Sequence, residues 1–345
     1  MDIQQLAGTA RDLVAPGKGI LAADESDRTI KRRFDAIRVE STEGNRRDYR
    51  EMLFRTRGIS DFISGVILFD ETIRQKGADG TPLAKVLTDQ GIIPGIKVDK
   101  GVKPLPGSGG ETITEGLDGL SERLAEYREL GARFAKWRAV ITIGADIPSR
   151  NCIRTNAHAL ARYAALCQEA GLVPIVEPEV LMDGDHGIDR CNEVTEVTLR
   201  EVYYELGQQG VVLEGTLLKP NMVLSGQSAA NRATAEEVAE KTVACLKRTV
   251  PAAVPGVVFL SGGQSDEEAT INLNAINQRA AAVGAPWPLR FSYGRALQAA
   301  PQKAWSGRAE NTSKAQRAFH HRARLAAAAA QGTYTLSMEQ DLAAD

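Results

Sequence analysis

The strongest constraint on the fold is a repeated order of elements: a short apolar run, a polar loop and then an amphipathic helical segment. Segments with helical periodicity include Gly119–Leu130, Ala157–Ala170, Ala235–Thr249 and Asp266–Ala282. Strict alternation of strands and helices indicates parallel pairing through right-handed crossovers. Eight such units predict an α/β fold, a closed (β/α)8 TIM barrel rather than an open sheet. The eight apolar runs have the length of buried strands: Gly19–Asp24, Gly65–Asp70, Ile92–Asp99, Phe134–Ile141, Leu172–Val180, Val212–Lys219, Val257–Gly262 and Leu289–Gly294.

The two ends of the chain lie outside this repeat. Ile3–Val14 and Glu310–Ala330 are predicted to be additional helices, and residues 331–345 are small and polar, so we expect a mobile C-terminal tail. A barrel of this type commonly takes about 250 residues. The chain of 345 residues is therefore expected to form a single barrel domain, residues 1–345.

The bulk composition excludes several classes of partner. The formal charge of −2 argues against nucleic-acid or membrane binding by the whole chain, and no apolar stretch reaches about 18 residues. The four cysteines show no CxxC spacing, which is typical of free thiols in a reducing compartment. The N-terminus, Met-Asp-Ile-Gln-Gln, lacks the features of a secretory signal. We expect a cytoplasmic protein whose partners are small molecules.

Lys219 closes an apolar stretch, Val211–Val223, that otherwise has the character of a buried strand. Two interpretations are open. The side chain could reach water at the strand edge like an ordinary surface lysine. If it is instead buried among positive neighbours such as Lys136, its pKa would fall toward that of a free amine, which is a nucleophile for carbonyl carbon.

Other strand ends carry paired charges that favour the second interpretation. Side chains alternate faces along a strand, so one face receives both members of three pairs: Lys97 with Asp99, Lys136 with Arg138, and Glu177 with Glu179. Each pair alone could belong to a solvated strand or a loop start. Because parallel strands of a barrel end at one mouth, the charges together predict an active site there.

The last two predicted strands end in loops suited to phosphate. Ser-Gly-Gly-Gln-Ser begins at Ser261 and Ser-Tyr-Gly-Arg spans Ser292–Arg295. Either could be a plain turn. Backbone N–H groups at a helix start bind phosphate, and a guanidinium adds a bidentate contact. Barrels often hold phosphate after these two strands.

The chain resembles the class I, Schiff-base fructose-bisphosphate aldolases from about Gly17 to Tyr334. The resemblance depends on six motifs in order: Gly-Lys-Gly-Ile-Leu-Ala-Ala-Asp-Glu-Ser, Phe-Ala-Lys-Trp-Arg, Pro-Ile-Val-Glu-Pro-Glu, Leu-Glu-Gly-Thr-Leu-Leu-Lys-Pro-Asn, Phe-Leu-Ser-Gly-Gly-Gln-Ser and Phe-Ser-Tyr-Gly-Arg-Ala-Leu. It implies reversible cleavage of fructose 1,6-bisphosphate to dihydroxyacetone phosphate and glyceraldehyde 3-phosphate in glycolysis and gluconeogenesis. It also implies no metal or other cofactor, sugar phosphates as substrates, and a homotetramer.

The resemblance assigns a role to individual residues. Lys219 would form the imine, Glu177 with neighbouring Glu179 would shuttle protons, Asp24 would take the hydroxyl proton, and Lys136 would lie between these groups. Lys97 and Arg138 would line the same cavity, and Gly263 is also among the residues implied to bind substrate or phosphate. One phosphate site would use Ser261, Gly262, Ser292, Gly294 and Arg295, and the other would use Ser26, Arg33 and Arg46.

The sequence departs from the family at two places. Asp27-Arg28-Thr29 replaces the small residues that often follow Asp-Glu-Ser, and the chain ends Leu-Ala-Ala-Asp rather than in the tyrosine of animal members. Three rival functions remain. A zinc-dependent aldolase is disfavoured because only four histidines occur, two of them adjacent. The others are a transaldolase-like Schiff-base lyase or transferase and a non-catalytic scaffold.

Overall fold

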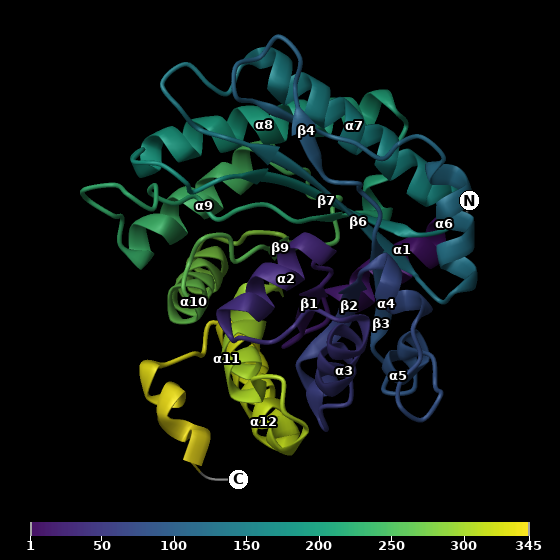
Figure 1. The fold of residues 1–345 in the computed structure, drawn as a ribbon. Helices are drawn as coiled ribbons and strands as arrows, with labels where there is room; N and C mark the ends of the chain where they lie inside the picture. Colours follow the sequence, from purple (N-terminus) through teal and green to yellow (C-terminus); the bar gives the residue numbers. More distant parts are fainter. Residues whose placement is uncertain (1, 344–345) are drawn as a thin grey trace.

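In a computed structural model, which describes residues 2–343, eight parallel strands form a closed barrel in the order β1-β10-β9-β8-β7-β6-β3-β2. Figure 1 shows the helices arranged around this barrel. The predicted eight-stranded barrel is confirmed. The strands are β1 Gly19–Ala23, β2 Ile63–Leu68, β3 Ile93–Lys97, β6 Phe134–Ile141, β7 Val173–Val180, β8 Leu217–Leu218, β9 Val257–Phe259 and β10 Leu289–Tyr293.

Twelve α-helices lie in the described part of the chain, and none of them is long and apolar enough to cross a membrane. The predicted N-terminal helix is α1, and the predicted helix near the C-terminus is α12. The bounds are α1 Ile3–Leu13, α2 Asp27–Ala36, α3 Glu43–Phe54, α4 Asp70–Arg74, α5 Leu83–Thr88, α6 Leu120–Glu129, α7 Arg150–Glu169, α8 Ile188–Gln208, α9 Ala235–Thr249, α10 Asp266–Ala282, α11 Arg295–Trp305 and α12 Thr312–Ala329.

The barrel interior is apolar at one end and is closed there by α1. Leu6 and Leu13 of α1 pack with interior side chains that include Ile20, Phe134 and Leu217. Gly95 is required beside Phe134, because a Cβ on Gly95 would lie 2.3 Å from the Phe134 ring. The other end of the interior is therefore the only one left for polar chemistry.

One predicted strand is much shorter in the structure. The run from Val212 forms a 3-10 helix, Leu213–Gly215, and only Leu217–Leu218 pair as β8. The Gln168 side chain accepts a hydrogen bond from Val212 N at 3.0 Å and donates one to Val212 O at 2.7 Å. An amide on α7 thus satisfies the backbone groups that a neighbouring strand would have paired.

Two further features were not predicted. Val102–Pro104 and Thr112–Thr114 form a separate antiparallel pair, β4 and β5. After α12, the 3-10 helix Leu336–Ala343 follows, and the Glu339 carboxylate accepts hydrogen bonds from Tyr334 Oη at 2.9 Å and from the Arg322 guanidinium at 2.6 Å. The expected mobility of residues 331–345 stays a prediction, and residues 344 and 345 lie outside the described residues.

Candidate active site

A polar cavity of about 1130 Å³ opens at the carboxyl ends of the strands. It brings together residues from distant parts of the chain, as the predicted convergence of strand ends requires. The predicted site residues that line it are Asp24, Ser26, Arg33, Lys97, Lys136, Arg138, Glu177, Glu179, Lys219, Ser261, Gly262, Ser292, Gly294 and Arg295. Arg46 and Gly263 are not part of this lining.

Side-chain alternation explains why charges reach the interior at this end. Phe134 and Leu217 lie in the interior apolar layer. Lys136 and Lys219 follow them two residues later, so each points to the same side as its predecessor. Trp137, with the opposite parity, packs outward against Tyr163, with ring centroids 5.6 Å apart. Each strand therefore runs from an apolar core layer into the cavity.

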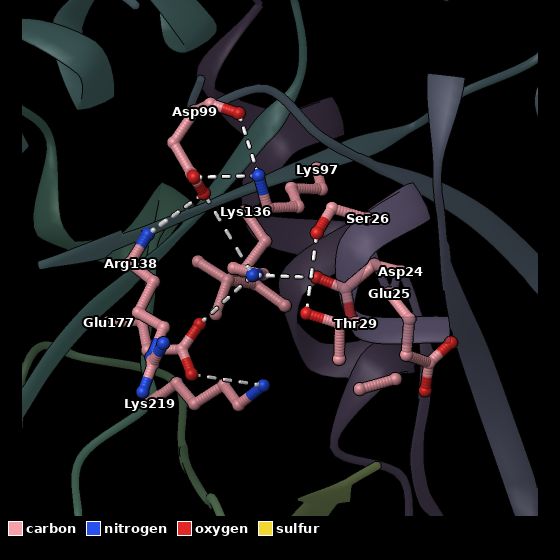
Figure 2. A network of polar contacts seen from close by, with 12 residues as sticks. Asp24, Glu25, Ser26, Thr29, Lys97, Asp99, Lys136, Arg138, Glu177 and Lys219 are labelled. Atoms are coloured by element: carbon pink, nitrogen blue, oxygen red, sulfur yellow. Dashed lines mark hydrogen bonds and ion pairs between the residues drawn. The ribbon is translucent and has the colours of Figure 1, made fainter. Parts of the chain in front are cut away.

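Glu177 lies between two buried lysines at the centre of the cavity (Figure 2). Its Oε1 is 3.3 Å from Lys219 Nζ and its Oε2 is 3.4 Å from Lys136 Nζ. Lys136 Nζ also lies 2.6 Å from Asp24 Oδ2. Only 4% of the surface of Lys219 is exposed, so the alternative of a surface lysine is wrong.

The expected direct repulsion between Lys136 and Lys219 is not what the geometry provides. A carboxylate, Glu177, separates the two amines and contacts both of them. The group in contact with Lys219 can therefore accept a proton from it, which a neighbouring ammonium cannot do.

Mutual pairing keeps Asp24 and Lys136 charged. Burial by itself would raise the pKa of Asp24, but electrostatic attraction, mainly from the Lys136 ammonium, holds that pKa below its ordinary value of 3.8. Burial would lower the pKa of Lys136, yet the carboxylates of Asp24, Glu177 and Asp99 raise it above its ordinary 10.5. The pair is therefore ionised throughout the neutral range.

We expect the contribution of Asp24 ionisation to stability to be constant near neutrality and lost in acid. Because its folded-state pKa is lowered, the unfolded chain binds the proton first as the pH falls through about 4. The difference in free energy of unfolding between the parent protein and Asp24→Asn should be equal at about pH 6 and pH 8 and should decrease below about pH 4. Chemical denaturation at each pH measures it, and a change between pH 6 and 8 contradicts the assignment.

Arg295, at the start of α11, joins the end of β10 to the loop after β9. Gly262 has a positive φ of 57°, in the left-handed region, and its carbonyl accepts a hydrogen bond from the Arg295 guanidinium. Ser292 Oγ is buried and has no hydrogen-bond partner within residues 2–343. A buried hydroxyl without a protein partner leaves a donor for a ligand oxygen.

Contacts within the protein account for the absence of Arg46 and Gly263 from the cavity lining. The Arg46 guanidinium is bound to the Glu71 carboxylate and donates to Ser41 O at 2.6 Å. A Cβ on Gly263 would lie 2.6 Å from the Met182 sulfur, so this glycine packs against the protein interior. Their predicted roles in binding substrate have no support from these positions.

Asp99 is a cavity residue to which the sequence analysis assigned no role. Its Oδ1 lies 2.7 Å from Lys97 Nζ, its Oδ2 lies 3.9 Å from Lys136 Nζ, and Arg138 N donates to Oδ2 at 3.3 Å. Its shared face with Lys97 was the available signal. Other lining residues without such a signal come from helices and loops: Arg32, Arg74, Lys100, Arg123 and Tyr127.

Among the described residues, no group of three or more His, Cys, Asp or Glu side chains could hold a metal ion. What the cavity does contain is a buried amine in contact with a carboxylate, beside loops that can receive phosphate. This arrangement on a (β/α)8 barrel defines a class of enzyme in which a lysine amine acts on the carbonyl of an anionic substrate.

Comparisons with known proteins agree with this class of enzyme and identify one family within it. The glycolytic fructose-bisphosphate aldolase class-I family model matches residues 5–345. A protein of Xanthomonas campestris named "Probable fructose-bisphosphate aldolase class 1" is 62% identical over 97% of this chain and 99% of its own. The cytoplasmic isozyme of fructose-bisphosphate aldolase from Spinacia oleracea is 56% identical over 96% of this chain and 92% of its own.

A solved structure shows the same relationship at the level of the fold. Fructose-bisphosphate aldolase from Plasmodium falciparum, in a complex with TRAP and a small-molecule inhibitor, has a TM-score of 0.94 and 52% identity, covering 96% of both chains. The chain therefore belongs to the class I fructose-bisphosphate aldolases, a family of metal-independent carbon–carbon lyases. The family resemblance drawn from the six motifs is confirmed.

Proposed function

We propose that the protein cleaves fructose 1,6-bisphosphate reversibly through an imine between Lys219 and the ketone of the substrate. The observation that carries this proposal is the buried Lys219 amine with the Glu177 carboxylate 3.3 Å away. Cleavage beside a ketone leaves a carbanion that is too basic to form freely in water. An iminium ion accepts that electron pair far better than a carbonyl does. A buried lysine that forms an imine with the ketone therefore makes the cleavage easier.

Glu177 has the position required of the acid–base group for imine formation. The carbinolamine formed by Lys219 must lose water, which needs a proton donor within hydrogen-bond reach of the departing hydroxyl. Glu177 can take a proton from the Lys219 amine and return it to that hydroxyl. Lys136, which stays charged, then polarises the oxygen from the other side of Glu177.

Asp24 would accept the proton of the C4 hydroxyl as the carbon–carbon bond breaks. The electron pair of that bond passes to the iminium ion, which forms an enamine on Lys219, while the C4 oxygen becomes an aldehyde. Lys136 Nζ, 2.6 Å from Asp24 Oδ2, holds this carboxylate ionised and fixes its orientation. Asp24 is thus available as a base in every part of the neutral pH range.

The order of strands supports an assignment of the two phosphates. β9 lies beside β8 in the barrel, so the Ser261–Gly262 loop is on the side of Lys219 and of the ketone. This loop, with Ser292, Gly294 and Arg295, would hold the phosphate on C1. Ser26 and Arg33 follow Asp24 along the chain and would hold the other phosphate. A Cβ on Gly294 would lie 3.8 Å from Arg33 Nη2, so the Arg33 guanidinium is within reach of either phosphate. Two fixed phosphates orient the reacting carbons, which lowers the barrier.

Chemical trapping with borohydride tests the proposal directly. Reduction in the presence of dihydroxyacetone phosphate should inactivate the protein and add one reduced adduct to Lys219, as located by mass spectrometry of its peptides. Prior dialysis against EDTA should change neither the activity nor the labelling. An adduct on Lys136 or Lys97 instead of Lys219 contradicts the assignment of the nucleophile.

We also propose that the protein works in the cytoplasm as a homotetramer. Relatives named as cytosolic or cytoplasmic isozymes support the location. The exposed side chains of Val197 and Tyr204 on α8 are candidates for burial between subunits. Sedimentation equilibrium should give the mass of four chains, and a monomer at working concentration contradicts the proposal.

A further inference from the structure

Glu25 follows Asp24 directly but faces the opposite side of the barrel wall. Leu21 and Ala23 belong to the outer hydrophobic layer, so Glu25 enters that layer, while Asp24 shares its parity with the interior residues Ile20 and Ala22. Figure 2 shows the Glu25 carboxylate turned away from the Asp24–Lys136 pair. Although it is a carboxylate, its residue is only 6% exposed. A buried charge in this position needs partners.

The partners of Glu25 connect the cavity with the layer behind it. Its Oε1 accepts hydrogen bonds from Arg33 Nη1 at 2.5 Å and from Gln298 Nε2 at 2.7 Å. Its Oε2 accepts none within residues 2–343 and lies 3.9 Å from Arg50 Nη2. Arg50 Nη2 also donates to the Glu25 carbonyl at 2.8 Å, which fixes the backbone of this loop.

Arg50 holds the Glu25 loop in place from the side away from the cavity. It lies on α3, is 1% exposed, and approaches Glu71 Oε2 at 3.5 Å. Gln298 on α11 also donates to Ala22 O at 2.7 Å, so the group that holds Glu25 is itself bound to β1. The Glu25 carboxylate therefore has a defined position, set by α3, α11 and β1 rather than by solvent.

Arg33 lines the substrate cavity together with Glu25, whereas Arg50 and Gln298 of this cluster do not. Its side chain is 23% exposed, and the carboxylate of Glu25 is its ion-pair partner. A long side chain loses rotamer freedom when it binds an anion, and a fixed carboxylate that has already ordered it removes part of that cost. Glu25 thus orders the Arg33 side chain for phosphate binding, although Glu25 itself need not contact the phosphate.

We propose that Glu25 is a positioning residue, which orients the Arg33 guanidinium toward a phosphate of the substrate. This inference rests on the proposed function. Glu25 is not a catalytic residue in this scheme, because the reacting carbons lie on the Asp24 side of the strand. Its effect should therefore appear in the binding of one phosphate and not in the chemical step.

Glu25→Gln tests this role because a glutamine side chain has nearly the same shape as glutamate but no charge. Its amide offers one acceptor oxygen to two donors, Arg33 and Gln298, so the Arg33 guanidinium loses its fixed charged partner. We expect KM for fructose 1,6-bisphosphate to rise about tenfold with kcat within about twofold of the parent value. Fructose 1-phosphate lacks the phosphate on C6. Its KM should rise too if Arg33 serves the phosphate on C1 and should stay within about twofold if Arg33 serves the phosphate on C6, with kcat within about twofold in both cases.

Two comparisons separate positioning from a general structural effect. In an Arg33→Ala background, Glu25→Gln should no longer raise KM, because the residue through which it acts is gone. Glu51→Gln is the matched control: Glu51 is a buried carboxylate on α3 that pairs with Arg55 and is outside the cavity lining. This control should keep the parent kinetics with both substrates.

The outcomes distinguish this inference from the proposed function. If the parent protein cleaves fructose 1,6-bisphosphate and is trapped at Lys219, but Glu25→Gln has parent kinetics or loses kcat without a rise in KM, the positioning role is overturned and the function stands. Absence of cleavage by the parent protein overturns the function itself. Should Glu25→Gln not fold, Glu25→Asp keeps the charge, withdraws it from Arg33, and should show the same selective rise in KM.

Discussion

Replacing Lys219 with alanine should lower kcat/KM for fructose 1,6-bisphosphate by about 10⁵-fold, since loss of a covalent nucleophile commonly has effects of this order. No other amine takes its place: Lys136 Nζ is held by the carboxylates of Asp24 and Glu177. The residual rate should come from substrate orientation alone. Steady-state cleavage assays measure the loss, and binding of the substrate to the inactive variant should persist, because the phosphate loops are intact.

Two companion variants identify the cause of that loss. Lys219→Arg keeps a positive charge beside Glu177 but removes the nucleophilic amine, so it should be as inactive as Lys219→Ala. Lys85→Ala removes an exposed lysine that pairs with Asp89 on the surface, and it should have parent activity. An active Lys219→Arg protein would show that charge, and not covalent chemistry, is what Lys219 contributes.

Glu177→Gln should reduce kcat by about 10³-fold, in the range for removal of a general acid–base group. The amide keeps the volume of the side chain between Lys219 and Lys136 but cannot carry a proton from one group to another. Formation of the imine should be slowed, so borohydride trapping of Lys219 should be slow but not absent. Rapid-quench measurement of the trapped species separates this step from bond cleavage.

Glu179→Gln provides the comparison for this second prediction. Its carboxylate is bonded to the Arg138 guanidinium and is not in contact with Lys219. The effect of Glu179→Gln on kcat should therefore be smaller than that of Glu177→Gln. If the two variants lose activity equally, proton transfer does not depend on direct contact with Lys219, and the assignment to Glu177 is wrong.

Sequence periodicity was sufficient for most of the fold but not for every boundary. β6 has the predicted bounds, Phe134–Ile141, because β7 pairs with it along its whole length. The predicted strand from Val212 failed because a single amide, that of Gln168, bonds its backbone instead. A run of apolar residues indicates that a segment is buried. A buried segment need not be a strand when a side chain forms hydrogen bonds with its backbone N–H and C=O groups.

The site residues divide in the same way. Alternation placed Lys136 and Glu177 on the inner face, and the structure confirms that they meet there. Arg46 was expected to bind phosphate, but its guanidinium is taken by Glu71. Glu25 entered the sequence analysis only as part of the Asp-Glu-Ser motif, since its partners Arg50 and Gln298 come from helices that no strand pattern links to it.

The amino-acid sequence by itself determined the eightfold strand–helix order, the parity that directs charged side chains to the inner face, and the motifs of the aldolase family. These are local properties, set by the alternation of side chains and the spacing of apolar residues. Only the tertiary structure decided which charges touch: that Glu177 separates Lys219 from Lys136, that Arg46 stays outside the cavity, and that Glu25 holds Arg33. Contacts between residues far apart in the chain depend on how the barrel closes, and a difference of a few ångströms decides whether two charges form a pair.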